Sequence, residues 1–499
     1  MSRRSQILPW IVVAAGVAVR LSAARGELWL DEMISLWHAV HAPSWLAIFD
    51  GIHSDNNHYL TSLWLRLLGE GHSPLLYRAP SLLAGAGTLA VVAAREKLEV
   101  LILFAASFIL VQYDSEARGY APMIFFAVAC FELARQERGA LFSICAVLGL
   151  SSHATFAFAL AAFALWKWQR PGWFVAPIAA LILFWTADWS VMARLGGTPE
   201  PLLDTLRRLA RATLGTPLGP LELLAIPALG FAFLALGRSR ERLFYQAIFL
   251  VPAAAVVVLQ PSFVAPRYFL VCVPFFLILL GEIPRVAIAA IVLLGAAQIA
   301  RLDRGHPQEV VQYMAEHTAG EVVRLSSDHK FRNWIVLEYY ARGEPKHFEY
   351  VDGEGALWYV VHDFSDEPQP PAIRGYTLVL RTPFFGLSGW RFFLYRRDRS
   401  EHPSMRLNLP ARSRDGAASS AAATGASGRT SPATAAAPAR WPASTARPPR
   451  RPPFPAPGPG GSGRGRRSER TSASRRRPPS RRLERASGRR GPNRRTTGR

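Results

Sequence analysis

The chain has 499 residues, half of them hydrophobic, and a mean hydropathy of +0.12. A soluble enzyme of this length usually lies below zero on that scale, so the composition argues against an ordinary soluble protein and favours membrane spans. Most of the net charge of +22 comes from residues 401–499, which hold 23 Arg, no Lys and four acids, and this leaves +3 for residues 1–400. With so little excess charge on the body, we expect no nucleic-acid partner.

Apolar runs separated by short basic clusters follow one another from Ile7 to Ala300. They predict a mainly α polytopic transmembrane bundle of about eleven spans. The expected spans are 7–24, 74–94, 98–113, 119–135, 139–151, 153–168, 172–188, 218–237, 243–260, 267–281 and 284–300. Nearly every short basic loop then falls on one side, so the positive-inside rule predicts a cytoplasmic N-terminus. Those loops are 95–97, 135–138, 167–170, 238–242 and 282–285.

The long loop 25–73 after the first span is therefore expected outside the cell or in the periplasm. It opens with Asp31 and Glu32. Two adjacent acids can cap the helix that follows, with Asp31 as the N-cap, or they can supply a general base, because each raises the proton affinity of the other. Farther along, Asp55 and His58 suit a divalent metal or an acceptor, and equally a polar turn before the next helix.

A second polar cluster runs from Tyr113 to Tyr120, between two expected spans, and contains Asp114, Glu116 and Arg118. Charged groups at the edge of a membrane are costly unless they are paired, so they indicate a functional site. The alternative is a structural ion pair between Glu116 and Arg118.

Arg267 and Tyr268 lie at the expected external mouth of the tenth span. An arginine beside aromatic rings can hold two phosphate oxygens, and it can also simply extend to the lipid headgroups. His153, alone between two apolar runs, fits a ligand or a satisfied interface histidine equally well.

After the last span, residues 302–398 change character. Helical stretches near 308–317 and 333–342 alternate with strand-like runs, which predicts a small α/β domain. The runs are 321–325, 357–362, 376–380 and 390–395. Because an odd number of spans precedes it, we expect this domain on the external side, with the polar clusters.

Residues 399–499 are built mainly from Arg, Pro, Ala, Ser and Gly, and cannot bury enough apolar surface to fold. The sharp onset of this stretch and its restriction to residues with GC-rich codons suggest an out-of-frame reading. The alternative is a genuine disordered basic tail that contacts anionic lipid or nucleic acid. Either way, we assign no chemistry to it.

Taken together, the motifs resemble the GT-C superfamily of membrane glycosyltransferases. The specific resemblance is to glycosyltransferase family 39, the branch of protein O-mannosyltransferases and aminoarabinose transferases, and especially to its bacterial lipopolysaccharide-core galacturonosyltransferase-like members. The matching residues are Leu30-Asp31-Glu32, Arg78-Ala79-Pro80-Ser81-Leu82, Tyr113 to Tyr120, and Arg267-Tyr268. The likeness covers residues 7 to about 300 and, more loosely, 302–398. Where such proteins often read His-Pro-Pro-Leu-Tyr, this chain has Asn57-His58-Tyr59-Leu60.

The resemblance implies an inverting transfer of a sugar from a polyprenyl-monophosphate donor to a glycan, lipid or protein acceptor, at the outer face of the cytoplasmic membrane. By position, Asp31 would be the general base and Glu32 its neighbour. Arg267, with Tyr268 and Arg118, would bind the donor phosphate. The remaining substrate-site candidates are Asp55, His58, Asp114, Glu116 and Tyr120.

Two other classes of protein stay open at this point. One is a membrane transporter or flippase for a charged or lipid-linked substrate, which would use the same charges as a pathway. The other is a non-catalytic scaffold that presents residues 302–398. Against the transporter, the sequence has no internal repeat and its acids collect on one face.

Overall fold

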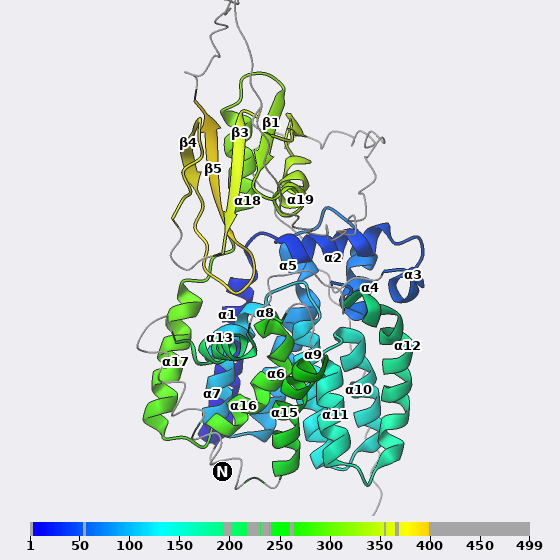
Figure 1. Ribbon diagram of the computed structural model, residues 1–499. Coiled ribbons are helices and arrows are strands. Elements are labelled where there is room, and N and C mark those ends of the chain that lie inside the picture. Colours follow the sequence, from blue (N-terminus) through cyan, green and yellow to red (C-terminus); the bar gives the residue numbers. More distant parts are fainter. Residues whose placement is uncertain are drawn as a thin grey trace, which may run out of the picture. The chain divides into compact units, whose positions relative to one another are not determined.

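The computed structural model describes residues 3–52, 56–192, 201–216, 230, 239, 241–259, 264–353, 356–364 and 369–398. They belong to one compact unit, mostly helical, with a five-stranded sheet near the end of the described chain (Figure 1).

The first part of the unit is helical as far as Ala300. Its first helices are α1 (Arg3–Ala23), α2 (Leu30–His41), α3 (Ala47–Asp50), α4 (Tyr59–Leu68), α5 (Pro74–Tyr77) and α6 (Ala79–Arg95). The next are α7 (Leu98–Ala106), α8 (Phe108–Asp114), α9 (Tyr120–Arg135), α10 (Gly139–Ser152), α11 (Phe156–Trp166), η1 (Pro171–Phe174) and α12 (Val175–Met192). The last are α13 (Leu202–Leu214), α15 (Arg242–Leu259), η3 (Pro266–Cys272), α16 (Val273–Leu280) and α17 (Arg285–Ala300).

Aromatic rings fill the centre of this helical part. Phe244 of α15 stacks on Phe163 of α11 at a ring-centroid distance of 4.8 Å and meets Phe275 of α16 edge-on at 4.8 Å. Phe131 of α9 lies 4.9 Å from the same ring. Four helices far apart in the chain are therefore joined through one buried side chain, and such aromatic contacts add to the stabilisation from burial itself.

The predicted mainly α class is confirmed, whereas the finer prediction of about eleven spans is not. Among the described residues, α15 is the one helix long and apolar enough to cross a membrane, and seven further apolar helices have 10–17 residues. The expected span 98–113 is divided into α7 and α8, because Ser107 has extended backbone angles (φ −68°, ψ 113°). The expected span 267–281 begins as the 3₁₀ helix η3. The expected span 218–237 lies outside the described residues, apart from Gly230.

The second part of the unit is an α/β arrangement. It consists of α18 (Pro307–Glu316), β1 (Val322–Ser327), α19 (Lys330–Ala341), β2 (His347–Tyr350), β3 (Trp358–Asp363), β4 (Tyr376–Arg381) and β5 (Arg391–Arg397). The strand order is β2-β1-β3-β5-β4. The β1–β2 and β1–β3 pairs are parallel, and the β3–β5 and β4–β5 pairs are antiparallel.

Both helices and all four strands expected in this part are present, and β2 is an addition. The helices contact each other, and α19 also contacts β1, β2 and β3. Trp358 is fully buried at the start of β3, where its Nε1 donates to Thr318 Oγ1 at 2.8 Å. A buried tryptophan whose ring nitrogen has a partner gives the α/β part a core of its own.

Candidate functional site

Helix α2 begins at Leu30, one residue after its N-cap, Trp29. Asp31 and Glu32 therefore lie within its first turn, and the alternative in which Asp31 is the N-cap is wrong. Glu32 supplies the capping contact instead, since its Oε2 accepts from the backbone N–H of Trp29 at 3.2 Å. Acidic side chains in a first turn are favoured by the helix dipole.

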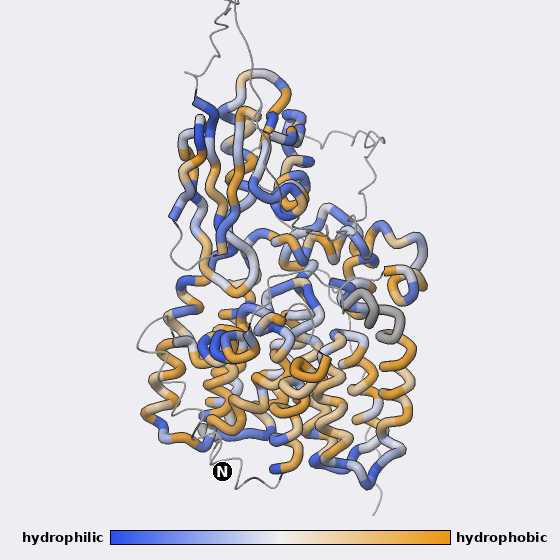
Figure 2. The backbone as a smooth tube through the Cα atoms, viewed as in Figure 1, coloured by the Kyte–Doolittle hydropathy of each residue, from blue (hydrophilic) through white to orange (hydrophobic). Residues whose placement is uncertain are grey.

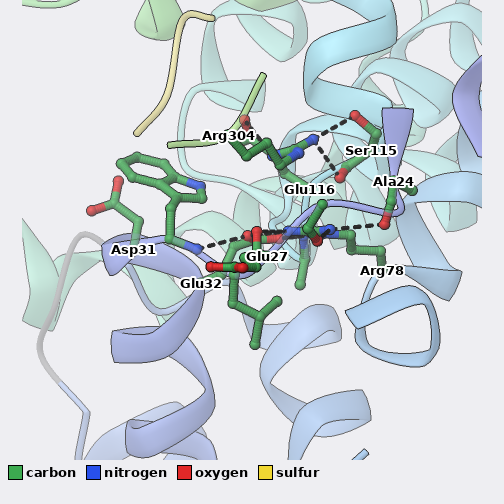
Figure 3. Close-up of polar contacts among 12 residues, drawn as sticks. Ala24, Glu27, Asp31, Glu32, Arg78, Ser115, Glu116 and Arg304 are labelled. Atoms are coloured by element: carbon green, nitrogen blue, oxygen red, sulfur yellow. Dashed lines mark hydrogen bonds and ion pairs between the residues drawn. The ribbon is translucent and has the colours of Figure 1, made fainter. Parts of the chain in front are cut away.

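Arg78 at the start of α6 binds the carboxylate of Glu32 through two parallel hydrogen bonds. Its Nε donates to Oε1 at 2.8 Å and its Nη2 to Oε2 at 2.7 Å. The other guanidinium N–H groups donate to the carbonyl oxygens of Ala24 and Gly26, at 2.8 and 2.5 Å, and of Glu27, at 2.7 Å. All five N–H groups of Arg78 are therefore used (Figure 3).

The Glu32 carboxylate has a further partner in the loop after α8, where the backbone N–H of Ala117 donates to Oε1 at 2.7 Å. Burial by itself raises the pKa of Glu32, but the charge and hydrogen bonds of Arg78 outweigh it, and the net shift is downward. The expectation that the neighbouring acid raises the pKa of Glu32 is therefore wrong. Glu32 joins the starts of α2 and α6 to the 115–118 loop.

The Asp31 carboxylate points away from Glu32 (Figure 3). Its Oδ2 lies 3.0 Å from Nη1 of Arg118 in an ion pair, although the two atoms are not aligned for a hydrogen bond. Arg118 also donates from Nη2 to Asn56 Oδ1 at 2.9 Å. Its guanidinium lies over the rings of Trp29, at 5.5 Å, and Tyr120, at 4.8 Å. Arg118 therefore pairs with Asp31, and the alternative of a Glu116–Arg118 ion pair is wrong.

Several polar atoms around this ion pair have no hydrogen-bond partner among the described residues. They are Asp31 Oδ2, Arg118 Nε and Nη1, His58 Nε2 and Trp29 Nε1. Buried polar atoms are normally satisfied, so a group of unmet donors around one carboxylate is the feature expected of a site that binds a ligand.

His58, the N-cap of α4, is fully buried beside a second histidine. Its ring stacks on that of His153 at a centroid distance of 4.9 Å, and Tyr120 lies 4.4 Å from His153. The backbone N–H of Thr155 donates to His153 Nδ1 at 3.1 Å, so the neutral tautomer of His153 carries its proton on Nε2. Burial, and then the electrostatic interactions with His153, Arg118 and Arg267, lower the pKa of His58 well below its usual value.

Arg267 is the second residue of η3, and its guanidinium lies 5.6 Å from the ring of Tyr268. Its charge, like that of Arg118, acts on His58. The structure thus brings the Arg267 and Tyr268 segment toward the same cluster as Asp31, Arg118 and Tyr120, although these residues are far apart in the sequence.

Asp114 belongs to a different contact. It accepts from Arg20 Nε of α1 at 2.6 Å, and both side chains are almost fully buried. Arg20 also donates to the carbonyl oxygens of Gly16 and Phe104, at 3.2 and 3.1 Å. This pair fixes α1 against the end of α8. Arg20 lies within the expected span 7–24, and nothing in the sequence indicates its partner.

Glu116 faces a residue that the sequence did not single out. Its Oε1 accepts from Gln112 Nε2 at 2.8 Å and lies 3.9 Å from Arg304 Nη1. Burial raises the pKa of Glu116, and the charges of Arg304 and Arg118 oppose the shift. Arg304 Nη2 donates to the carbonyl oxygen and the Oγ of Ser115, at 2.9 and 2.7 Å (Figure 3). Burial and the nearby charge of Arg78 lower the pKa of Arg304 to about 10.

The α/β part also holds the segment that leads to Asp31. The Tyr340 hydroxyl of α19 accepts from the backbone N–H of Leu28 at 2.8 Å and donates to its carbonyl oxygen at 3.1 Å. The backbone N–H of Gln308 donates to Glu27 Oε2 at 2.8 Å. Residues 24–32 are thus held by α6 and by the α/β part.

Asp55 lies outside the described residues. In the part of the chain that the structure describes, no group of three or more His, Cys, Asp or Glu side chains is arranged to hold a metal ion.

No family model, curated protein or solved structure matches the chain at a significant level. Its function is therefore inferred from the geometry around Asp31 and from the helices that carry it.

Proposed function

We propose that the chain is an integral-membrane inverting glycosyltransferase, which moves a sugar from a polyprenyl-monophosphate donor to an acceptor at the outer face of the cytoplasmic membrane. The observation that carries the proposal is the Asp31–Arg118 ion pair, at 3.0 Å. It places a carboxylate with an unmet oxygen next to a guanidinium with unmet donors. A base and a phosphate-binding cation side by side are what this reaction needs.

Exposed apolar side chains on the helices support a membrane location. Large aliphatic side chains on α6, α12, α15 and α17 are between 71% and 78% exposed. They are Leu83, Leu183, Val258, Val286 and Leu293. Figure 2 shows hydrophobic residues along much of the length of α12, α15 and α17. Apolar surface of this extent is unfavourable in water and suits contact with lipid or with other protein.

In the proposed reaction, Asp31 takes the proton of an acceptor hydroxyl. The acceptor oxygen attacks the anomeric carbon from the face opposite the phosphate, and the bond between that carbon and the phosphate oxygen breaks. The phosphate leaves with the electron pair, and the configuration at the anomeric carbon inverts. Arg267 and Arg118 stabilise the negative charge that develops on the phosphate.

Glu32 has a supporting role in this proposal. Both of its oxygens are occupied by Arg78 and by two backbone N–H groups, so neither is available to a substrate hydroxyl. Its hydrogen bonds hold α2 in the orientation that directs the Asp31 carboxylate toward Arg118.

The test is transfer by membranes that contain the protein, incubated with a panel of polyprenyl-phosphate sugars and scored for a covalent sugar product. We expect product with the wild type and a large loss with Asp31→Asn. Movement of the lipid-linked sugar across the membrane without any product would favour the transporter alternative. Topology is tested separately with reporter fusions at Arg95, Arg138, Arg238 and Gly353. A reporter active only in the cytoplasm that gives signal at Gly353 would overturn the external site.

A further inference from the structure

A second polar cluster lies in the α/β part. It joins the carboxyl ends of two parallel strands, β1 and β3, to the start of α19. We call it the strand-end cluster, and it consists of Asp328, Arg332, Asn333, His362, Phe364 and Trp390. The proposed transfer reaction does not use any of these residues.

The topology of the sheet makes this edge a favourable place for a ligand. β1 lies in the sheet between β2 and β3 and is parallel to both. The chain leaves β1 through α19 toward β2 on one side, and it later returns to β3 on the other side. In α/β sheets, ligands bind outside the carboxyl ends of the strands where the order reverses in this way. Asp328 directly follows β1, and Phe364 directly follows β3.

Hydrogen bonds fix the polar side chains of the cluster. Asp328 Oδ1 accepts from Asn333 Nδ2 at 2.7 Å, and Asp328 Oδ2 lies 3.0 Å from His362 Nδ1. On the other side of the imidazole, Arg332 Nη1 lies 3.2 Å from His362 Nε2. Since the arginine can only donate, the neutral His362 ring carries its proton on Nδ1 and donates a hydrogen bond from there to Asp328.

Two buried polar atoms of the cluster have no partner among the described residues. They are the carbonyl oxygen of the Asn333 side chain, which is an acceptor, and the Nε1 of Trp390, which is a donor. Both side chains are more than nine-tenths buried. The amide of Asn333 cannot be reversed, because its nitrogen is needed by Asp328. A ligand that satisfies the cluster would donate one hydrogen bond to Asn333 and accept one from Trp390. A hydroxyl group can do both.

An aromatic surface adjoins these polar groups. Phe364 is 51% exposed, and its ring lies 5.5 Å from that of Trp390 and 5.3 Å from that of His362. The Arg332 guanidinium is 5.4 Å from the same Phe364 ring. An exposed ring beside fixed polar side chains can stack on the apolar face of a sugar while the polar groups bind its hydroxyls.

The charges in the cluster argue against an ion as the ligand. Asp328 and Arg332 offset each other, and the unmet Asn333 oxygen would face the lone pairs of any anion. We propose that the strand-end cluster is a binding site for a neutral polyhydroxylated ligand, a sugar unit, with its hydroxyls paired to Asn333 and Trp390 and its apolar face on Phe364. The proposal is independent of the transfer reaction.

The test is saturation-transfer NMR on the full chain in nanodiscs, which avoids detergents with sugar headgroups. The probes are D-galactose and N-acetyl-D-glucosamine, with D-galacturonate as the charged counterpart of galactose. We expect saturation transfer to the neutral sugars. Trp390→Phe keeps an aromatic ring and removes the unmet donor, and its melting temperature measures what the smaller ring costs in packing at this buried position. Its affinity should fall by about 2- to 12-fold, the usual effect of losing one neutral hydrogen bond. Phe364→Ala, at an exposed position, should weaken binding as well.

Trp334→Phe is the matched control. Trp334 lies on α19, like Arg332 and Asn333, but its ring contacts Tyr350, at a centroid distance of 5.7 Å, and is not part of the cluster. It should bind both sugars like the wild type. Asp31→Asn should also bind them normally even when transfer is lost, which separates this site from the proposed active site. The proposal is overturned if the wild type binds neither neutral sugar, if Trp390→Phe and Phe364→Ala bind like the wild type, or if galacturonate binds more tightly than galactose.

Discussion

Asp31 and Glu32 are adjacent in the first turn of α2, yet their carboxylates bind different arginines. Glu32 is paired with Arg78, and both side chains are fully buried. Asp31 is paired with Arg118, and 12% of its side chain stays exposed. One member of the acidic pair is thus fully engaged by the protein, and the other keeps an oxygen without a hydrogen bond among the described residues.

Asp31→Asn should retain the fold and cut sugar transfer by roughly 10²–10⁴-fold, the usual effect of removing a positioned proton acceptor. Glu32→Ala should instead destabilise the protein by about 3–5 kcal/mol, since it leaves the buried guanidinium of Arg78 without its counter-charge. Thermal unfolding and transfer rate, measured on both variants, distinguish the two effects. An Asp31→Asn variant with wild-type transfer would exclude Asp31 as the base and make Glu116 the better candidate.

Arg267→Ala should weaken binding of the polyprenyl-phosphate donor as well as turnover, because a charge-assisted phosphate contact is lost. Arg267→Lys should restore part of both, since lysine keeps the charge without the planar pair of donors. Donor titrations of the transfer rate give the two parameters. Unchanged donor affinity in the alanine variant would contradict a phosphate-binding role.

Tyr340→Phe should loosen residues 24–32, because Leu28 loses both of its hydrogen bonds with the hydroxyl group. Hydrogen–deuterium exchange should show faster exchange in that segment. Tyr339→Phe is the matched control, since the neighbouring hydroxyl has no hydrogen bond to any described residue. Equal exchange in wild type and Tyr340→Phe would show that the α/β part does not hold the segment.

The buried His58 should make the protein less stable in mild acid. In the unfolded chain His58 takes up a proton near its ordinary pKa of 6.5, whereas its lowered pKa keeps it neutral in the folded state. The free energy of unfolding should therefore fall as the pH drops below about 6.5, by at most about 1.4 kcal/mol per pH unit. His58→Asn should show a shallower decline in melting temperature between about pH 7.5 and 5.5. The same decline in both proteins would assign the effect to other groups.

Deletion of residues 405–499 should leave membrane insertion and transfer intact, because this stretch has too few apolar residues to form a core. Membrane fractionation and the transfer assay measure the two properties. If the shortened protein disappears from the membrane fraction, the stretch has a role that its composition does not reveal.

Local patterns predicted much of the α/β part. The runs at 321–325, 357–362, 376–380 and 390–395 are rich in β-branched and aromatic residues. Each coincides with an observed strand, and the ends agree within one or two residues. Strand β2 was missed because His347–Tyr350 has four residues, of which only Phe348 is buried. A segment that short has no measurable alternation, and its pairing with β1 depends on tertiary structure.

Several residues of the candidate site could be predicted from the sequence, but their pairings could not, because these also depend on tertiary structure. The sequence indicated Asp31, Arg118 and Arg267 as functional residues, but not which acid binds which base. Arg20 meets Asp114 across 94 residues, and Arg304 meets Ser115 across 189. Contacts over such separations leave no periodic signal in the sequence, so neither arginine could be given its partner.

The hydrogen bonds between Leu28 and Tyr340 have a consequence for how the protein is made. These residues are separated by 312 positions in the chain. At ordinary rates of synthesis, roughly 15 to 60 s pass between the emergence of one and of the other. The segment before Asp31 therefore spends most of translation without its two hydrogen bonds to Tyr340. Nascent chains that stop before α19 cannot complete this contact, so the segment before Asp31 reaches its final set of hydrogen bonds only after about two-thirds of the chain has been made.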